Sequence, residues 1–310
     1  MRYGLPYKGS KNAIAKWVVN QLPRAEYFVD LFFGGGAITH CALLSRKYEK
    51  FIINDIDGRL PKLFMDCVHG KYTVENHREW ISRDEFNRRK ADDAYIALIW
   101  SFGNNGKDYL YGADIEEYKH AYHALIFDGN AKPLESYGIK VKPSKHNNPY
   151  MRYLEYAPQI KGLFEKAKEH KFELEKLERL QTIERLESLY RLQSLQSLQS
   201  DYQDVKIPKN AVLYCDPPYA DTNCGKYSGF DSKRFYEWAD RQDNIFISEY
   251  RMPDNFIPIA HVSKPILSTA NGSGATVEEY IFTNERTFKS FDDDTKAMYR
   301  ASVAEQISFF

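Results

Sequence analysis

The segment Asp216-Pro217-Pro218-Tyr219 has the residue types best suited to chemistry, and it follows the apolar run Ala211–Cys215. Consecutive prolines keep the chain extended, because Pro218 disfavours helical geometry at Pro217. A carboxylate and one fixed main-chain oxygen, that of Pro217, are therefore expected side by side at the end of a strand. Two adjacent acceptors suit an exocyclic amino group, which has two N–H donors, and the Tyr219 ring can stack on the base that bears this group.

A glycine turn near the start of the chain has the pattern of a ligand-binding loop. The aromatic and apolar run Tyr27–Phe33 predicts a strand, and Gly34–Gly36 leads from it into a predicted helix, Ala37–Arg46. The next predicted strand, Phe51–Ile53, ends at Asn54 and Asp55. An acid about 20 residues after such a turn is well placed to bind ribose hydroxyls. The segment therefore predicts a βαβ unit whose ligand edge lies at the carboxyl ends of the strands.

Each of these motifs has a simpler explanation when it is taken alone. A glycine run after a strand is more often a tight turn than a cofactor loop, and Asp55 could cap a helix. The Asp-Pro-Pro-Tyr segment could be a surface turn. The three motifs in this order and spacing are hard to obtain in a purely structural protein, so we favour a shared site.

The balance of charge restricts how the chain could meet a polyanion. Lys plus Arg and Asp plus Glu both number 43, so the net charge is zero and any nucleic-acid face must be local. Residues 1–25 and 136–154 carry cations without acids, and the second stretch also carries tyrosines and amides. A solvated basic loop is the alternative reading. The candidate DNA contacts are Lys140, Lys142, Lys145, Asn147, Asn148 and Arg152.

Composition bounds the class of protein. The chain has 310 residues, of which 43% are hydrophobic, and no apolar run approaches the roughly 20 residues that cross a bilayer. No signal-peptide pattern opens the sequence, so we expect a soluble cytoplasmic protein. The four cysteines form no CxxC pair and no zinc spacing, which predicts reduced thiols and no metal site.

The remaining patterns define the organisation. Further strands are predicted at 211–215, 244–248, 265–268 and 277–283, and helices at 11–22 and 232–241. We therefore expect one doubly wound α/β domain from residues 1–60 and 200–290, an inserted and mainly helical region at 61–199, and a C-terminal tail at 291–310. Aliphatic residues recur every third position from Leu174 to Leu198. This period fits neither one amphipathic helix nor a heptad. Within it, Leu-Gln-Ser repeats in tandem at residues 192–200, and this repeat suggests a spacer or short stacked turns that pack on the insertion, with a partner-binding surface as the alternative.

In this order, the motifs resemble those of the Dam-like, D12 class (alpha group) DNA adenine-N6 methyltransferases. The resemblance implies a Rossmann-like sheet that binds S-adenosylmethionine, with the insertion as target-recognition region, and it implies transfer of a methyl group to an adenine flipped out of double-stranded DNA. It implies no metal, and we expect a monomer. Because cytosine presents the same amine, cytosine-N4 methylation is an alternative. A catalytically inactive DNA-binding or adaptor protein is another.

The resemblance also implies roles for individual residues. The segment Tyr7–Lys11 matches an amino-terminal motif that usually has Trp and Gly where this chain has Tyr7 and Ser10, and Gln199–Tyr202 matches a segment bordering the adenine of the cofactor. Phe246–Tyr250 is similar to a strand that supports the pocket, and Ser268–Thr276 is similar to a glycine-rich loop. The implied cofactor-binding residues are Tyr7, Lys11, Asp30, Phe33, Gly34, Gly36, Asp55 and Asp216. The implied catalytic residues are Asp216, Pro217, Pro218 and Tyr219.

Overall fold

The computed structural model describes residues 2–160, 170–190, 194–219, 229–265 and 276–307. The chain divides into two compact units. We call residues 1–10 and 62–191 the helical unit, and residues 11–61 and 192–310 the sheet unit. No helix among the described residues has an apolar stretch long enough to span a membrane.

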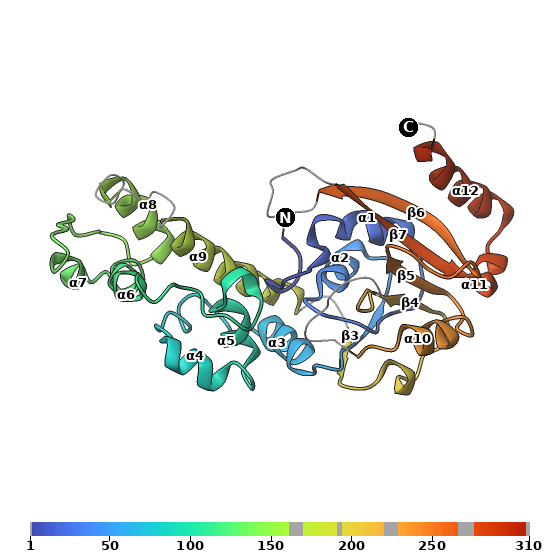
Figure 1. Cartoon of the computed structure of the whole chain (residues 1–310), viewed down its shortest axis with the longest axis horizontal. Helices are drawn as coiled ribbons and strands as arrows, with labels where there is room; N and C mark the ends of the chain where they lie inside the picture. The colour runs from blue at the N-terminus through green and yellow to red at the C-terminus, as the bar shows by residue number, and fades with distance from the viewer. Residues whose placement is uncertain (1, 161–169, 191–193, 220–228, 266–275, 308–310) are drawn as a thin grey trace. The chain divides into compact units, whose positions relative to one another are not determined.

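The sheet unit contains every strand among the described residues, and Figure 1 shows helices on both sides of these strands. Its helices and turns are η1 (Lys11–Ala13), α1 (Ala15–Gln21), α2 (Ala37–Ser45), η5 (Tyr202–Asp204), α10 (Ser232–Ala239), α11 (Glu285–Ser290) and α12 (Asp293–Ile307). Its strands are β1 (Tyr27–Asp30), β2 (Lys50–Asn54), β3 (Ser194–Leu198), β4 (Ala211–Cys215), β5 (Ile245–Glu249), β6 (Phe256–Pro265) and β7 (Thr276–Asn284).

The described strands form one seven-stranded sheet in the order β3-β2-β1-β4-β5-β7-β6. Strands β1 to β5 are mutually parallel, whereas β7 runs antiparallel to β5 and pairs with β6 as a second antiparallel neighbour. The chain order reverses between β1 and β4, and ligands of open α/β sheets bind outside the carboxyl ends of the strands at such a point. This mostly parallel sheet confirms the predicted Rossmann-like methyltransferase class.

Burial explains why these segments form strands. Every residue of β4 and β5 is buried, as expected for central parallel strands covered by helices on both faces. On one face, Val29, Leu213 and Ile247 pack with Phe235 of α10. On the other face, Phe28 contacts the rings of Tyr48, Phe51 and Tyr214.

The tandem Leu-Gln-Ser repeat is a strand of the sheet, so its interpretation as a spacer or stacked turns was wrong. Ser194–Leu198 forms edge strand β3, paired in parallel with Lys50–Asn54. Upstream, the same three-residue period continues through α9 (His170–Glu184) and the 3-10 turn η4 (Arg185–Leu189), in which Leu186 and Leu189 are buried. A 3-10 helix has three residues per turn, so this spacing keeps both leucines on one face.

Most of the strand predicted at 265–268 lies outside the described part of the chain, and its first residue, Pro265, is the last residue of β6. The rest of β6, from Phe256 to Lys264, was not predicted. Pro258 and Pro265 obscured this strand in the sequence, because proline lacks the N–H that a ladder needs. Strand β6 is an edge strand with an irregular register between Pro258 and Ala260, and such a position tolerates proline.

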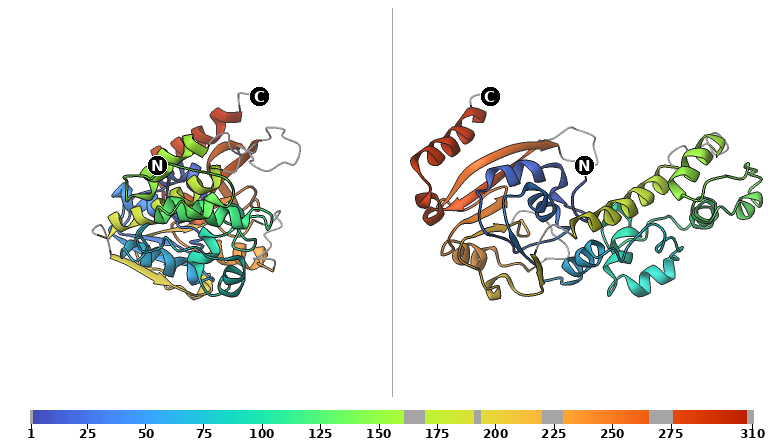
Figure 2. Two further views of the ribbon diagram at one scale, coloured as in Figure 1. Left: turned by 90° about the vertical axis from the view of Figure 1, so that its left-hand side faces the viewer. Right: turned by 180° about the vertical axis from the view of Figure 1, so that it is seen from behind.

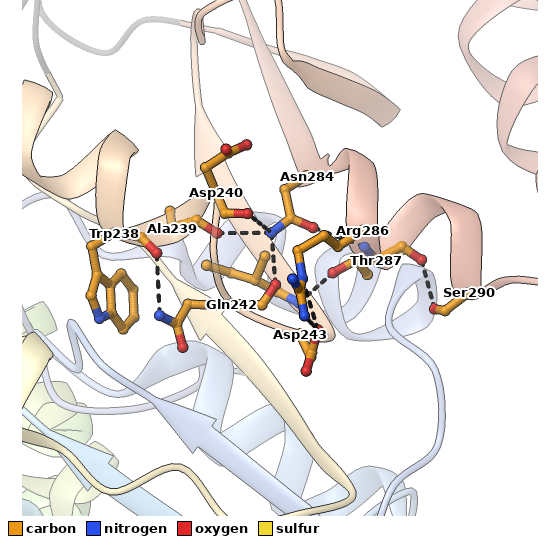
Figure 3. A network of polar contacts seen from close by, with 10 residues as sticks. Trp238, Ala239, Asp240, Gln242, Asp243, Asn284, Arg286, Thr287 and Ser290 are labelled. Atoms are coloured by element: carbon orange, nitrogen blue, oxygen red, sulfur yellow. Dashed lines mark hydrogen bonds and ion pairs between the residues drawn. The ribbon is translucent and has the colours of Figure 1, made fainter.

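A polar network around Asn284 joins the end of β7 to the end of α10 and the turn that follows it (Figure 3). The Asn284 amide donates to three main-chain carbonyls, those of Ala239, Asp240 and Gln242, at 2.7 to 3.2 Å. Its oxygen accepts from the Thr287 N–H at 2.8 Å, and so caps α11. Asn284 is fully buried and is the last residue of β7, so these hydrogen bonds hold that end of the strand in place.

The last described helix, α12, packs against β6 (Figure 2). The Tyr299 hydroxyl on α12 donates to the Gln21 carbonyl at the end of α1, at 2.8 Å. Residues 293–307 of the predicted C-terminal tail are therefore helical.

The helical unit consists of short helices and connecting loops. Its core includes the pair Lys176 and His123, in which the Lys176 ammonium lies 2.7 Å from His123 Nδ1 and 3.7 Å from the centre of the Trp100 ring. Helix α3 starts just before the boundary between the units. The elements are α3 (Arg59–Val68), α4 (Arg83–Arg89), α5 (Ala94–Ile99), η2 (Phe102–Asn104), α6 (Glu116–His123), η3 (Ala124–Asp128), α7 (Lys132–Glu135), α8 (Pro149–Ile160), α9 (His170–Glu184) and η4 (Arg185–Leu189).

Candidate active site

Three acids stand at the carboxyl ends of three adjacent parallel strands. Asp30 is the last residue of β1, Asp55 follows β2, and Asp216 follows β4. Burial raises the pKa of Asp30 to about 7, against a hydrogen bond from Thr39 that lowers it, and the charges of Asp216 and Asp55 raise it further. Because β2, β1 and β4 are adjacent and parallel, the structure brings the three predicted acids to the same edge of the sheet.

The glycine turn holds Asp55 through main-chain hydrogen bonds. The Gly34 N–H donates to Asp55 Oδ2 and the Asp57 N–H to Asp55 Oδ1, both at 2.8 Å. Gly34 and Gly36 have positive φ angles of 50° and 69°, which favour glycine. A Cβ at Gly36 would lie only 2.2 Å from Cζ of the buried Phe33 ring. The turn therefore needs glycine for its conformation and for the close approach of Phe33.

Asn54 joins the same turn to strand β3. Its amide nitrogen donates to the carbonyls of Leu31 and Ser200 at 3.2 and 3.1 Å, and its oxygen accepts from the Ser200 N–H at 3.0 Å. The Gln199–Tyr202 segment consequently lies at the carboxyl ends of β1 and β2, next to Asp55. Its Gln199 side chain is exposed, whereas Tyr202 is buried against Phe32.

Lys11 forms an ion pair with Asp216. Its ammonium lies 3.1 Å from Asp216 Oδ1, and its side chain is only 9% exposed, whereas that of Asp216 is 21% exposed. Burial lowers the pKa of Lys11, but attraction to Asp216 and Glu279 outweighs burial, so the pKa is raised. Burial raises the pKa of Asp216, and the nearby ammonium opposes that change. The site thus contains a partly exposed carboxylate beside a protonated lysine.

Tyr219 is held at its hydroxyl and along its ring. The hydroxyl accepts from the Lys11 ammonium and donates to Glu279 Oε1. The Lys11 ammonium also lies 4.4 Å from the ring centre, and the Tyr250 ring meets the Tyr219 ring edge-on at 4.5 Å. Burial raises the pKa of the Tyr219 phenol, so it stays protonated and can donate this hydrogen bond.

Glu279 on β7 is a site residue that the sequence reasoning missed. Its carboxylate is fully buried and lies 3.3 Å from the Lys11 ammonium. The alternation of side chains along β7 puts Glu279 on the same face as Ile281 and Thr283, which are both buried. A single acid in register with buried residues was the signal that could have revealed it.

Other predicted positions contribute differently. Tyr7 belongs to the helical unit, where it is half-buried, so its contact with the cofactor stays a prediction. The Phe246–Tyr250 segment forms β5 and the residue after it, and its Glu249 is buried at the carboxyl end of the strand. Most of the Ser268–Thr276 loop lies outside the described residues.

The candidate DNA contacts in the helical unit fall into two groups. Lys140, Lys142, Lys145 and Asn147 are exposed, and Asn148 caps α8 by accepting from the N–H groups of residues 150 and 151. Arg152 is instead buried. Its guanidinium donates to the carbonyls of Phe127 and His146 at 2.7 Å and of Ile126 at 3.3 Å. Arg152 therefore holds the loop together, and the proposed DNA-contacting face depends on the other side chains.

The three cysteines that the structure describes are not among the site residues named above. Cys41, Cys67 and Cys215 are buried thiols, and Cys224 lies outside the described residues. Within the described ranges, no group of three His, Cys, Asp or Glu side chains is arranged to hold a metal ion.

Comparison with known proteins agrees with this geometry. A search of curated proteins found no match. A sequence model of the D12 class N6 adenine-specific DNA methyltransferases matches residues 7–256, a range that includes the glycine turn, Asp55 and the whole Asp216–Tyr219 segment. The chain therefore belongs to the D12 class N6 adenine-specific DNA methyltransferase family.

Proposed function

We propose that this protein transfers the methyl group of S-adenosylmethionine to the N6 amine of an adenine flipped out of double-stranded DNA. The observation that carries the proposal is the position of Asp216 directly after β4, at the sheet edge where Asp30 and Asp55 also lie. This edge belongs to the switch point of the sheet, where a cofactor and a substrate can both reach the same carboxylates.

The residues present fit S-adenosylmethionine, which when bound supplies a methyl group on a positively charged sulfur. The Gly34–Gly36 turn lets the main chain approach a ligand closely. Asp55 retains acceptor capacity beyond its two main-chain hydrogen bonds, because each carboxylate oxygen has two lone pairs, and it can bind ribose hydroxyls. Asp30 Oδ1 is buried and has no hydrogen-bond partner at ordinary geometry. The main chain of Phe32 is still close enough to lower the pKa of the Asp30 carboxyl group. The carboxyl groups of Asp30, Asp55 and Asp216, which lie at the ends of three adjacent strands, suit a cationic ligand.

Asp216 and the Pro217 carbonyl are the groups that would hold the target amine. An adenine amino group is a poor nucleophile, because its lone pair is delocalised into the ring. Accepting both of its N–H groups favours a more tetrahedral nitrogen, which makes the lone pair available for in-line attack. Asp216 need not be a strong base, since the nitrogen becomes acidic once it is methylated, and its proton can then leave.

The target base must leave the helix to reach these groups. An amine in a duplex is inaccessible, and flipping costs a few kcal/mol of unstacking. We infer that the Tyr219 ring, fixed by Lys11 and Glu279, stacks on the flipped base. The exposed Lys140, Lys142 and Lys145 would contact phosphates, which gives an affinity that falls with salt.

Methyl transfer from labelled S-adenosylmethionine to unmethylated genomic DNA, followed by nucleoside analysis, tests this proposal. We expect N6-methyladenine as the product. N4-methylcytosine would assign the enzyme to the alternative reaction, and the absence of product from folded protein would favour an inactive DNA-binding or adaptor protein. Sequencing that detects modified bases in the same DNA would then give the recognition sequence.

A further inference from the structure

Glu279 has no part in the reaction as proposed above, yet it is fully buried against two residues of the site. We propose that Glu279 is a positioning residue that draws the Lys11 ammonium away from Asp216 when the target amine binds. This inference rests on the proposed function, because it concerns how Asp216 becomes available to the amine.

The antiparallel direction of β7 explains how Glu279 reaches the site. Tyr280 of β7 pairs with Glu249, the last residue of β5, so Glu279 lies beyond the carboxyl end of that strand. The Asn284 network holds the other end of β7 in place (Figure 3). A residue of the antiparallel hairpin thereby arrives at the edge where the parallel strands present their acids.

Lys11 divides its hydrogen bonds among three partners. Its ammonium lies 3.1 Å from Asp216 Oδ1 and 3.3 Å from Glu279 Oε1, and it donates to the Tyr219 hydroxyl. An ammonium has three N–H donors, so this set occupies all of them. The same Asp216 carboxylate is the proposed acceptor for the adenine amine. Because the ion pair with Lys11 draws on the negative charge of this carboxylate, Lys11 weakens Asp216 as an acceptor, and in this sense the ammonium and the amine compete for it.

Glu279 resolves this competition through its charge. When the amine takes the Asp216 carboxylate, the ammonium keeps Tyr219 and a second buried carboxylate, so its charge remains paired. Without the charge of Glu279, Asp216 would be the nearest anion left for Lys11 among these partners, and a buried charge loses an ionic partner only at high cost. The ammonium would then stay on Asp216 and oppose binding of the amine.

Glu279→Gln tests the role of this charge, because glutamine has nearly the same shape and still accepts from the Tyr219 hydroxyl. We expect kcat for DNA methylation to fall by roughly 10- to 100-fold, the range expected for loss of a charge-assisted hydrogen bond. The affinity for S-adenosylmethionine and the melting temperature should stay close to those of the unaltered protein. An unchanged kcat, or a loss explained by unfolding or weaker cofactor binding, would overturn the proposal.

Glu278→Gln is the matched control, since Glu278 is the adjacent residue on the opposite face of β7. Its carboxylate accepts from the Ser263 hydroxyl and lies 2.9 Å from His261 Nδ1. We expect the kcat of Glu278→Gln to stay within about twofold of that of the unaltered protein, because removing one charge from a partly exposed ion pair usually has a small effect. An equal loss of kcat in both variants would show a general effect of charge on β7 and would contradict the specific role of Glu279.

A double-mutant cycle with Lys11→Met then separates this role from a structural one. If Glu279 acts through Lys11, Glu279→Gln should change kcat by less than about threefold in the Lys11→Met background. The same loss in both backgrounds would contradict the proposal. The double variant removes both buried charges, so neither is left without its partner, and it therefore serves as a control for misfolding of the single variants. If the unaltered protein makes no N6-methyladenine, the proposed function fails; if it does and the cycle is additive, only this inference fails.

Discussion

The carboxyl group of Asp30 should make the folded protein less stable as the pH rises. Burial, repulsion from Asp216 and repulsion from Asp55 raise its pKa from an ordinary 3.8 to about 7, against the hydrogen bond from Thr39. Between these two values the folded state binds more protons than the unfolded state, so the free energy of unfolding falls as the pH increases. The rise in pKa corresponds to a fall of at most about 4 kcal/mol in the free energy of unfolding, and most of this fall is complete by pH 7.

Asp30→Asn removes this titration and keeps an oxygen that accepts from the Thr39 hydroxyl, now 2.6 Å from Asp30 Oδ2. We expect the variant to become more stable than the unaltered protein, with the advantage growing by about 2 to 3 kcal/mol between pH 5 and pH 8. Cofactor affinity should fall, because a site carboxylate is lost. On this reasoning, the Asp30 carboxyl group lowers the free energy of unfolding but increases the affinity for the cofactor.

Urea unfolding at the two pH values measures this advantage. Hydrogen exchange of peptides from β1 and β4 should be recorded along the titration, so that the result refers to the sheet unit. Titrating groups that do not interact with Asp30 are common to both proteins and cancel in the comparison, so the difference reports on Asp30 and on its coupling to Asp216 and Asp55. A difference in stability that does not change with pH, or that grows toward low pH, would refute the electrostatic reasoning about the three acids.

Three further changes test other parts of the site. Asp55→Ala should weaken S-adenosylmethionine binding by roughly 10- to 100-fold in calorimetry, since a charge-assisted hydrogen bond contributes about 1.5 to 3 kcal/mol; unchanged affinity would remove Asp55 from the cofactor site. Gly36→Ala should lower the melting temperature, because the new Cβ would lie 2.2 Å from the Phe33 ring in a left-handed conformation, and a melting curve like that of the unaltered protein would show that the turn adapts. Reversing the charges of Lys142 and Lys145 together should weaken DNA binding at all sequences and reduce its salt dependence, whereas unaltered binding isotherms would exclude this loop from the interface.

Local signals in the sequence were enough to predict much of the fold and part of the candidate site. The glycine turn, the acid after β2 and the Asp216–Tyr219 segment each combine a strand with the residues that end it. In parallel strands those ends meet at one edge, so their convergence follows from topology. The strand segments 211–215 and 277–283 were likewise recognisable from short apolar runs.

Features that depend on distant pairing could not be predicted in the same way. Strand β3 is a polar Ser-Gln-Leu segment that becomes a strand only because it pairs with β2, far away in the chain. Glu279 reaches Lys11 only through the antiparallel register of β7. Arg152 counted as a surface cation in the sequence, but its guanidinium satisfies main-chain carbonyls in the interior. In each case the partner, rather than the residue itself, determines the role.

The central claim is that the Asp216 carboxylate and the Pro217 carbonyl hold the amine that receives the methyl group. Single-turnover methyl transfer to unmethylated DNA by Asp216→Ala, compared with the unaltered protein, tests it most directly. We predict that the rate of N6-methyladenine formation falls by at least about a thousandfold, as expected when a main transition-state contact is lost, while S-adenosylmethionine still binds. A variant that methylates adenine at nearly the original rate would contradict the account.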